Sequence, residues 1–101
     1  VASMRKEYRA RRDFVLQKLS KVGQLSCSRP RAGMFIMCDV SGTGLSGREF
    51  AEQLLSAEQV SVVPGDAFGP SAAGFVRIGL AQNQVTLRKA CKRIRRFCES
   101  L

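Results

Sequence analysis

The sequence predicts an α+β fold in which a three-stranded, mainly antiparallel sheet is packed with helices in the order α-β-α-β-β-α. Three stretches repeat apolar residues at the three- and four-residue steps of a helix, and three short apolar runs have the length of strands. The 101 residues can build one modest hydrophobic core. Residues 1–101 are therefore expected to form a single domain with helices on one face of the sheet.

The first helix is expected over residues 3–22, and Gly23 follows it as a C-terminal stop. Its apolar side chains fall on one stripe, made of Met4, Tyr8, Val15, Leu19 and Val22. Pro30 and Gly33 then precede the apolar run 34–40. That run is expected to be a strand with both faces largely covered.

The second helix has the clearest start in the chain. Segment 46–49 reads Ser-Gly-Arg-Glu, which matches a capping box in which the Ser46 hydroxyl and the Glu49 carboxylate bind backbone amides. Leu45 and Phe50 stand at the positions of a hydrophobic staple. The helix is expected to continue to about Glu58.

Two further strands and a helix complete the predicted fold. Residues 60–63 form one strand, which Pro64 ends, and residues 74–81 form the next. The last helix carries an apolar stripe to the end of the chain, made of Leu87, Ala90, Cys91, Ile94, Phe97, Cys98 and Leu101.

The formal net charge is +9, and most of it lies in the first and last helices. Clustered cations attract polyanions such as nucleic acids. An amphipathic helix also places its charged residues on a solvated face, and that is the reading favoured here. No apolar run approaches the roughly 18 residues of a membrane span.

The four cysteines, Cys27, Cys38, Cys91 and Cys98, form no CxxC pair, and the chain has no histidine. No metal site is therefore expected. The cysteines are interpreted as small buried hydrophobes with free thiols, which is typical of a reducing compartment and predicts a cytoplasmic location.

The chain offers no recognisable catalytic residue, because no triad, paired carboxylates or phosphate-binding loop is present. Arg77, inside the apolar run 74–81, is the exception to an otherwise ordinary scaffold. A guanidinium in a strand must be paired or held at a cavity wall. One possibility is an internal salt bridge to Asp39 or Asp66, and another is an edge strand whose arginine reaches water.

The loop before Arg77 favours a third possibility. It contains Gly65, Gly69 and Gly74, which permit backbone shapes and close approaches that a Cβ would block. Such a loop beside a buried cation suits a small anionic ligand, since the guanidinium fork matches a carboxylate through two parallel hydrogen bonds.

Two segments resemble the C-terminal signature of pyridoxal-phosphate aminotransferases of class I/II, the aspartate aminotransferase family of fold type I. Segment 63–69 reads Val-Pro-Gly-Asp-Ala-Phe-Gly, and segment 74–81 reads Gly-Phe-Val-Arg-Ile-Gly-Leu-Ala. Segments 8–13, 30–36 and 87–94 resemble the helix, first strand and last helix of that family's small domain. The resemblance covers nearly the whole chain in the correct order.

The resemblance implies a role for each candidate site residue. Arg77 would bind the α-carboxylate of the amino-acid substrate, and Phe35 would lie near that substrate, although a core role for Phe35 is equally open. Phe68 and Gly69 would shape the mouth of the pocket. The parent enzyme would be a homodimer that uses pyridoxal 5′-phosphate to exchange an amino group between an amino acid and a 2-oxo acid.

The cofactor lysine and the other cofactor ligands of the family have no counterpart in this sequence. The chain would therefore be the C-terminal small domain of such an enzyme, without its large cofactor-binding domain, and would be inactive alone.

Two alternatives remain open. One is a stand-alone regulatory domain that binds amino acids and uses Arg77 without any cofactor. The other is a basic RNA-binding domain, because segment 71–78 partly resembles an RNA-recognition strand. That likeness is incomplete, since Ala73 and Ile78 stand where aromatic residues are needed.

Overall fold

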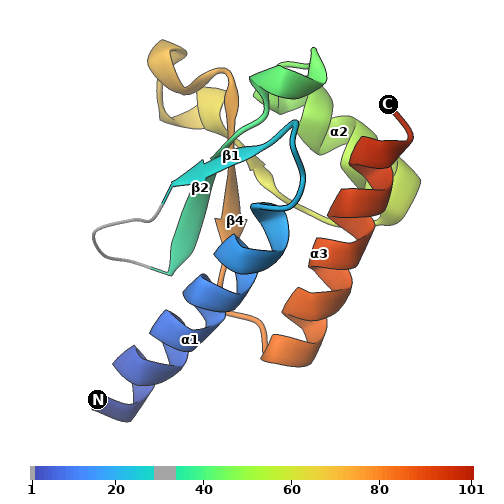
Figure 1. Cartoon of the computed structure of the whole chain (residues 1–101). Helices are drawn as coiled ribbons and strands as arrows, with labels where there is room; N and C mark the ends of the chain where they lie inside the picture. Colours follow the sequence, from blue (N-terminus) through green and yellow to red (C-terminus); the bar gives the residue numbers. More distant parts are fainter. Residues whose placement is uncertain (1, 29–33) are drawn as a thin grey trace.

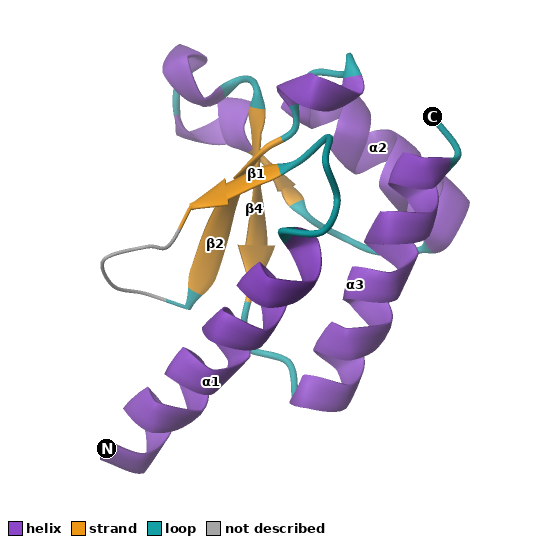
Figure 2. Ribbon diagram, in the orientation of Figure 1, coloured by secondary structure: helices purple, strands orange, loops and turns teal. Residues whose placement is uncertain are grey.

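A computed structural model describes residues 2–28 and 34–101, with side chains described from residue 6 onward within those ranges. The helices are α1 (Ala2–Leu19), α2 (Gly47–Glu58) and α3 (Gln84–Glu99), and the strands are β1 (Ser26–Ser28), β2 (Phe35–Asp39), β3 (Val63–Pro64) and β4 (Phe75–Gly79). Short 3-10 turns occupy Ser41–Thr43, Gly65–Phe68 and Pro70–Ala72. Figure 1 shows α1 and α3 side by side, and Figure 2 separates the helices from the strands.

The sheet has four strands in the order β1-β2-β4-β3, and every neighbouring pair is antiparallel. The α+β class is confirmed, but the expectation of three strands in the order α-β-α-β-β-α is wrong. Strand β1 adds an element between α1 and β2. Its three residues read Ser-Cys-Ser, which is too short and too polar to show the period of a strand. Its conformation depends on pairing with β2, a tertiary contact that local pattern does not reveal.

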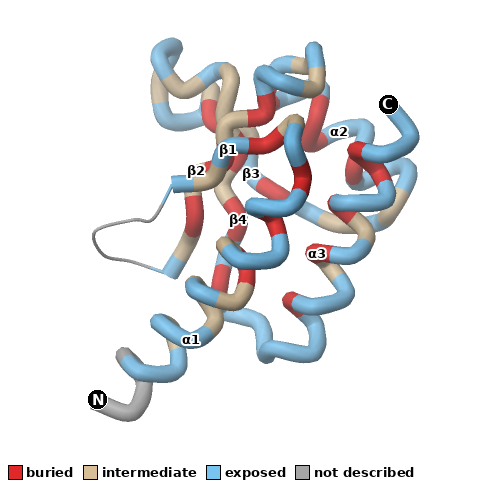
Figure 3. The backbone as a smooth tube through the Cα atoms, in the orientation of Figure 1, coloured by how far each residue is buried: buried red, intermediate tan, exposed pale blue. Residues whose placement is uncertain are grey.

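One face of the sheet is buried and the other is half open. Buried and half-buried residues alternate along β2 and β4, as Figure 3 illustrates. The buried positions Ile36, Cys38, Val76 and Ile78 join one core with side chains of all three helices. The strand predicted over residues 34–40 is expected from the sequence to have both faces largely covered. In β2, Ile36 and Cys38 are fully buried on one face, whereas Phe35 and Met37 on the other are half-buried.

The α2 start confirms the predicted capping box. Ser46 Oγ accepts a hydrogen bond from the Glu49 backbone N–H at 3.1 Å, and Glu49 Oε1 accepts one from the Ser46 N–H at 2.9 Å. These contacts satisfy amides that the first helical turn leaves without partners. Phe50, the predicted staple residue, is buried in the core.

Three predicted boundaries differ from the structure. Helix α1 ends at Leu19, although Val22 is still buried in the turn that follows. Of the strand predicted over residues 60–63, only residue 63 pairs with β4, together with residue 64; residues 60–62 run outside the sheet. Helix α3 ends at Glu99, and Leu101 is 50% exposed and does not extend the buried stripe. The predicted turn at Pro30 and Gly33 lies outside the described residues.

The cysteines divide into two classes. Cys27 and Cys38 lie opposite each other on β1 and β2 and form a disulfide, with their Cα atoms 4.1 Å apart. The prediction of four free thiols is therefore wrong for this pair, because only the sheet register brings the two residues together. Cys91 and Cys98 are free and buried, as predicted. Burial raises the pKa of each thiol to about 11.

No helix in the described ranges is both long enough and apolar enough to cross a membrane.

Candidate functional site

Arg77 lies at the centre of β4, which is an interior strand between β2 and β3. Its neighbours Val76 and Ile78 face the helices, so the alternation of the strand turns Arg77 toward the opposite, half-open face. Across the sheet it stands opposite Met37 and Val63. The alternative of an edge-strand arginine is therefore wrong.

Two aromatic rings contact the guanidinium. The Arg77 Cζ atom lies 4.9 Å from the centre of the Phe35 ring and 4.6 Å from the centre of the Phe68 ring. Phe35 is on β2, whereas Phe68 comes from the 3-10 turn 65–68. The structure thus brings together three residues that the sequence singled out from separate segments. Cation–π contacts of this kind fix a guanidinium without using its N–H groups.

No carboxylate among the described residues pairs with Arg77. Asp66 accepts an ion-paired hydrogen bond from Arg48 Nη2 at 2.9 Å. Asp39 Oδ1 accepts a hydrogen bond from the Ser41 backbone N–H at 2.9 Å, and hydrogen bonds from Ser41 lower the pKa of the Asp39 carboxyl. Both acids have other partners, although Asp66 uses only Oδ2 and its buried Oδ1 has no hydrogen-bond partner within the described ranges. Neither forms a salt bridge with Arg77, so the internal salt bridge is also wrong.

The loop that carries Phe68 is folded tightly against the start of β4. A Cβ on Gly65 would lie 2.1 Å from the Ala72 carbonyl oxygen and 2.7 Å from that of Phe75. Gly69, directly after Phe68, has φ 128°, which a side chain would oppose. Two of the predicted glycines are thus required by close approach or by backbone conformation, and they set where the Phe68 ring lies.

An ion pair between Arg48 and Asp66, which the sequence did not predict, joins the same loop to α2. Arg48 in the first turn of α2 donates from Nε to Asp66 Oδ2 at 3.0 Å, and the Gly47 N–H donates to the Ala73 carbonyl oxygen at 2.8 Å. The two charged residues are 18 positions apart, so no helical or strand period relates them. Only the folded loop brings them into contact.

The described site can bind an anion, and the carboxylate in its loop, Asp66, is ion-paired with Arg48. The positive charge of the site comes from half-buried Arg77, whose guanidinium N–H groups make no hydrogen bond to another described residue. The lysines lie elsewhere, on α1, just after it, and on α3: Lys6, Lys18, Lys21, Lys89 and Lys92. A planar ligand group with two oxygens, such as a carboxylate, matches the guanidinium fork.

The sequence also matches a known family over most of its length. The model of the family "Aminotransferase class I and II" matches residues 1–94. The chain is 50% identical over 92 residues to an arginine–pyruvate transaminase of Pseudomonas aeruginosa, and the match covers 91% of this chain and 23% of that protein. It is 36% identical over 99 residues to an aspartate aminotransferase of Pyrococcus horikoshii, covering 98% of this chain and 25% of the relative.

Solved structures agree with the sequence matches. The chain superposes on an aromatic aminotransferase from Pyrococcus horikoshii OT3 with a TM-score of 0.94 and 36% identity, covering 98% of this chain and 26% of that one. An aspartate aminotransferase from Thermotoga maritima gives a TM-score of 0.86 at 30% identity, covering 97% and 24% of the two chains. The chain therefore spans about a quarter of the length of the proteins it matches.

Proposed function

The chain belongs to the class I and II aminotransferase family, and from that premise we propose that it is the C-terminal small domain of a pyridoxal-phosphate-dependent aminotransferase. In this proposal residues 1–101 are one domain, and Arg77 binds the α-carboxylate of the amino-acid substrate. The observation that carries the assignment is the half-buried guanidinium, which two rings hold and which no described carboxylate neutralises.

The proposed reaction moves an amino group from an amino acid to a 2-oxo acid. Both substrates carry a carboxylate next to the reacting carbon, so one arginine can bind either of them in the same orientation. We further propose that the whole enzyme is a cytoplasmic homodimer. The buried free thiols Cys91 and Cys98 fit a reducing compartment, and the Cys27–Cys38 pair would be subject to reduction there.

The geometry supports a positioning role for Arg77. Its two ring contacts restrict the guanidinium plane, and the carboxylate would bind along the N–H edge through two parallel hydrogen bonds. A substrate held at two points cannot rotate about its carboxylate, so its α-carbon has a fixed direction. Phe35 and Phe68 would act by orienting Arg77 and by reducing its contact with water.

Pyridoxal phosphate is the cofactor that the family implies, and it supplies the electron sink for amino transfer. The described residues do not fit it, because all five lysines are exposed and none lies on the sheet face that bears Arg77. We therefore assign the cofactor to residues outside this chain and expect the 101 residues alone to be inactive.

Substitution of Arg77 in the full-length enzyme tests the proposal. Arg77→Ala should lower kcat/KM for an amino acid by at least about 100-fold, because a charged hydrogen-bonded pair of this kind contributes about 3 kcal/mol. The kcat/KM of Arg77→Lys should lie between those of the wild type and Arg77→Ala, since lysine keeps the charge but loses the planar fork of N–H groups.

A substrate comparison separates binding from folding. An amine without an α-carboxylate should react at nearly the same rate with the wild type and with Arg77→Ala. Arg95→Ala, which removes an exposed arginine on α3, serves as the matched control and should leave both reactions unchanged. Equal loss with both substrates would make Arg77 a structural arginine and refute the assignment.

A further inference from the structure

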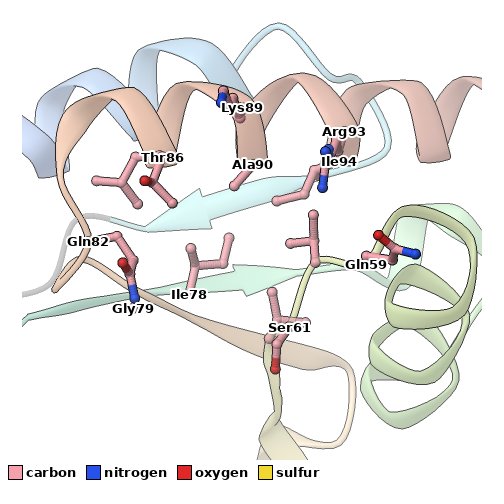
Figure 4. Close-up of a pocket in the computed structure, with 13 residues that line it drawn as sticks. Gln59, Ser61, Ile78, Gly79, Gln82, Thr86, Lys89, Ala90, Arg93 and Ile94 are labelled. Atoms are coloured by element: carbon pink, nitrogen blue, oxygen red, sulfur yellow. The ribbon is translucent and has the colours of Figure 1, made fainter.

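A cavity of about 390 Å³ lies between α3 and the C-terminal end of β4, with segment 59–62 along its side (Figure 4). Its origin is visible in the strand pairing. Strand β3 pairs with β4 only at Val63 and Pro64, so the residues before Val63 leave the sheet and open a space beside Ile78 and Gly79. This volume is within the range of pockets that hold small organic ligands.

The floor of the cavity is apolar. Buried side chains from three different segments meet there, and Figure 4 shows Ala90 and Ile94 of α3 facing Ile78 of β4 across it. The apolar lining residues are Val60, Val62, Ile78, Leu87, Ala90 and Ile94. A ligand with a hydrocarbon or aryl body would remove this surface from water, and that burial favours binding.

The rim is polar and positive. Lys89 and Arg93 lie one turn apart on α3, and no aspartate or glutamate lines the cavity. Arg93 Nη1 donates to the backbone carbonyl oxygen of Glu58 at 3.3 Å, whereas the Glu58 carboxylate accepts from Arg96 Nε at 2.9 Å. Within the described residues, neither rim cation forms an ion pair with a carboxylate, although the charge of Arg93 is among the causes that lower the pKa of the Glu58 carboxyl.

We propose that this cavity binds a small amphiphilic carboxylate, with an aryl or short acyl body on the apolar floor and its carboxylate between Lys89 and Arg93. The charge of the rim selects the anion, and the apolar floor favours a body of several carbons. Ile78 borders this cavity from the side of β4 opposite to Arg77. The proposal thus stands independently of the role assigned to Arg77.

Titration of the 101-residue chain with 4-phenylbutyrate, followed by ¹H–¹⁵N NMR, tests this site. We expect saturable shifts confined to amides around Ser61, Gly79 and Ala90. The neutral analogue 4-phenylbutanamide has the same body and should bind about fivefold more weakly, because it loses the ionic contacts at a solvent-exposed rim. Equal affinity for the acid and the amide would overturn the proposal.

Three variants test whether the carboxylate binds at Arg93 and the aryl body beside Ala90. Arg93→Gln should weaken 4-phenylbutyrate binding by about fivefold, whereas Lys92→Gln makes the same charge change on an exposed residue that does not line the cavity and should have little effect. Ala90→Leu should abolish binding by filling the space without altering charge. Melting curves identify any variant that unfolds.

Two results would refute the site. In one, Lys92→Gln weakens binding as much as Arg93→Gln, and Ala90→Leu has no effect. In the other, sedimentation shows that a second copy of the chain covers the cavity and that the acid does not displace it.

Discussion

Arg77 is held by aromatic rings and not by an internal acid, and this difference matters for a residue that we propose binds a carboxylate. An arginine already paired with a carboxylate must exchange that partner before it can bind a ligand. Phe35 and Phe68 instead contact the guanidinium with their rings, whose centres lie 4.9 and 4.6 Å from Cζ. Its hydrogen-bonding edge therefore stays available, and the charge remains partly shielded from water.

Phe68→Ala tests the contribution of the ring contact. Phe68 is 49% exposed, so its removal should change the melting temperature little. Loss of a cation–π contact worth about 1 kcal/mol should raise KM for the amino acid about fivefold in the full-length enzyme, with a smaller effect on kcat. Phe68→Tyr should restore the wild-type KM, because it retains the ring. A Phe68→Ala variant with unchanged KM would exclude Phe68 from the site.

The sequence identified Arg77 as a candidate because an arginine interrupts an apolar strand, a local signal. It could not show which rings contact the guanidinium. Phe35 reaches Arg77 only because β2 pairs with β4 in the register that sets Met37 opposite Arg77. The Arg48–Asp66 ion pair likewise depends on how the loop 65–73 folds back. The sequence alone shows that an arginine interrupts the strand. Which residues of other segments contact it depends on the tertiary structure.

At the scale of the elements, helix α3 supplies the largest share of the helical core. Leu87, Cys91, Ile94 and Phe97 are buried along one face, and the Phe97 ring packs edge-to-face on Phe50 of α2 at 5.3 Å. A complete amphipathic period marks this helix in the sequence, and in the structure the Asn83 side chain caps its start. Helix α2 is marked in the same way by its capping box.

Strands β1 and β3 lack such local signals. Strand β1 has three polar or small residues, and β3 keeps only two residues of an apolar run that continues outside the sheet. Their bounds follow from pairing with β2 and β4. Val60 and Val62 look like part of a strand, but they line the cavity beside α3 and lie outside the sheet.

Ile94→Asp tests the packing of α3. Ile94 is 1% exposed, and an aspartate there would bury a charge without a partner, so we expect a loss of about 4 kcal/mol in the free energy of unfolding. Urea titration followed by circular dichroism measures this loss. Lys92→Asp, on an exposed face of the same helix, should cost less than about 1 kcal/mol. Similar midpoints for Ile94→Asp and the wild type would contradict the assigned core.

At the scale of the whole molecule, the core links the reactivity of the thiols to folding. Burial raises the pKa of Cys91 and Cys98 from the usual 9.0 to about 11, so both stay protonated and unreactive in the folded chain. A pKa raised by folding stabilises the folded state below pH 9, and this contribution is lost as the pH rises toward 11.

Alkylation with iodoacetamide at pH 8 tests both the burial and the disulfide. The folded chain should incorporate almost no label, and the chain unfolded in urea without reductant should incorporate two labels, on Cys91 and Cys98. Reductant should raise that number to four by opening the Cys27–Cys38 bond. Four labels without reductant would show that the disulfide is absent, and rapid labelling of the folded chain would contradict the burial.

The distribution of lysines over the whole molecule leads to the last prediction. A lysine that bonds covalently to pyridoxal phosphate needs a site that lowers its pKa and orients the cofactor. All five lysines here are exposed, and Lys89 lies at the rim of the partly open cavity beside α3. The isolated chain mixed with pyridoxal phosphate should therefore show only weak, non-saturating absorption changes, and it should not convert an amino acid and a 2-oxo acid. Lys89→Gln is the most informative control, because a saturable absorption band that this single substitution removed would place a cofactor site within the 101 residues and contradict the small-domain assignment.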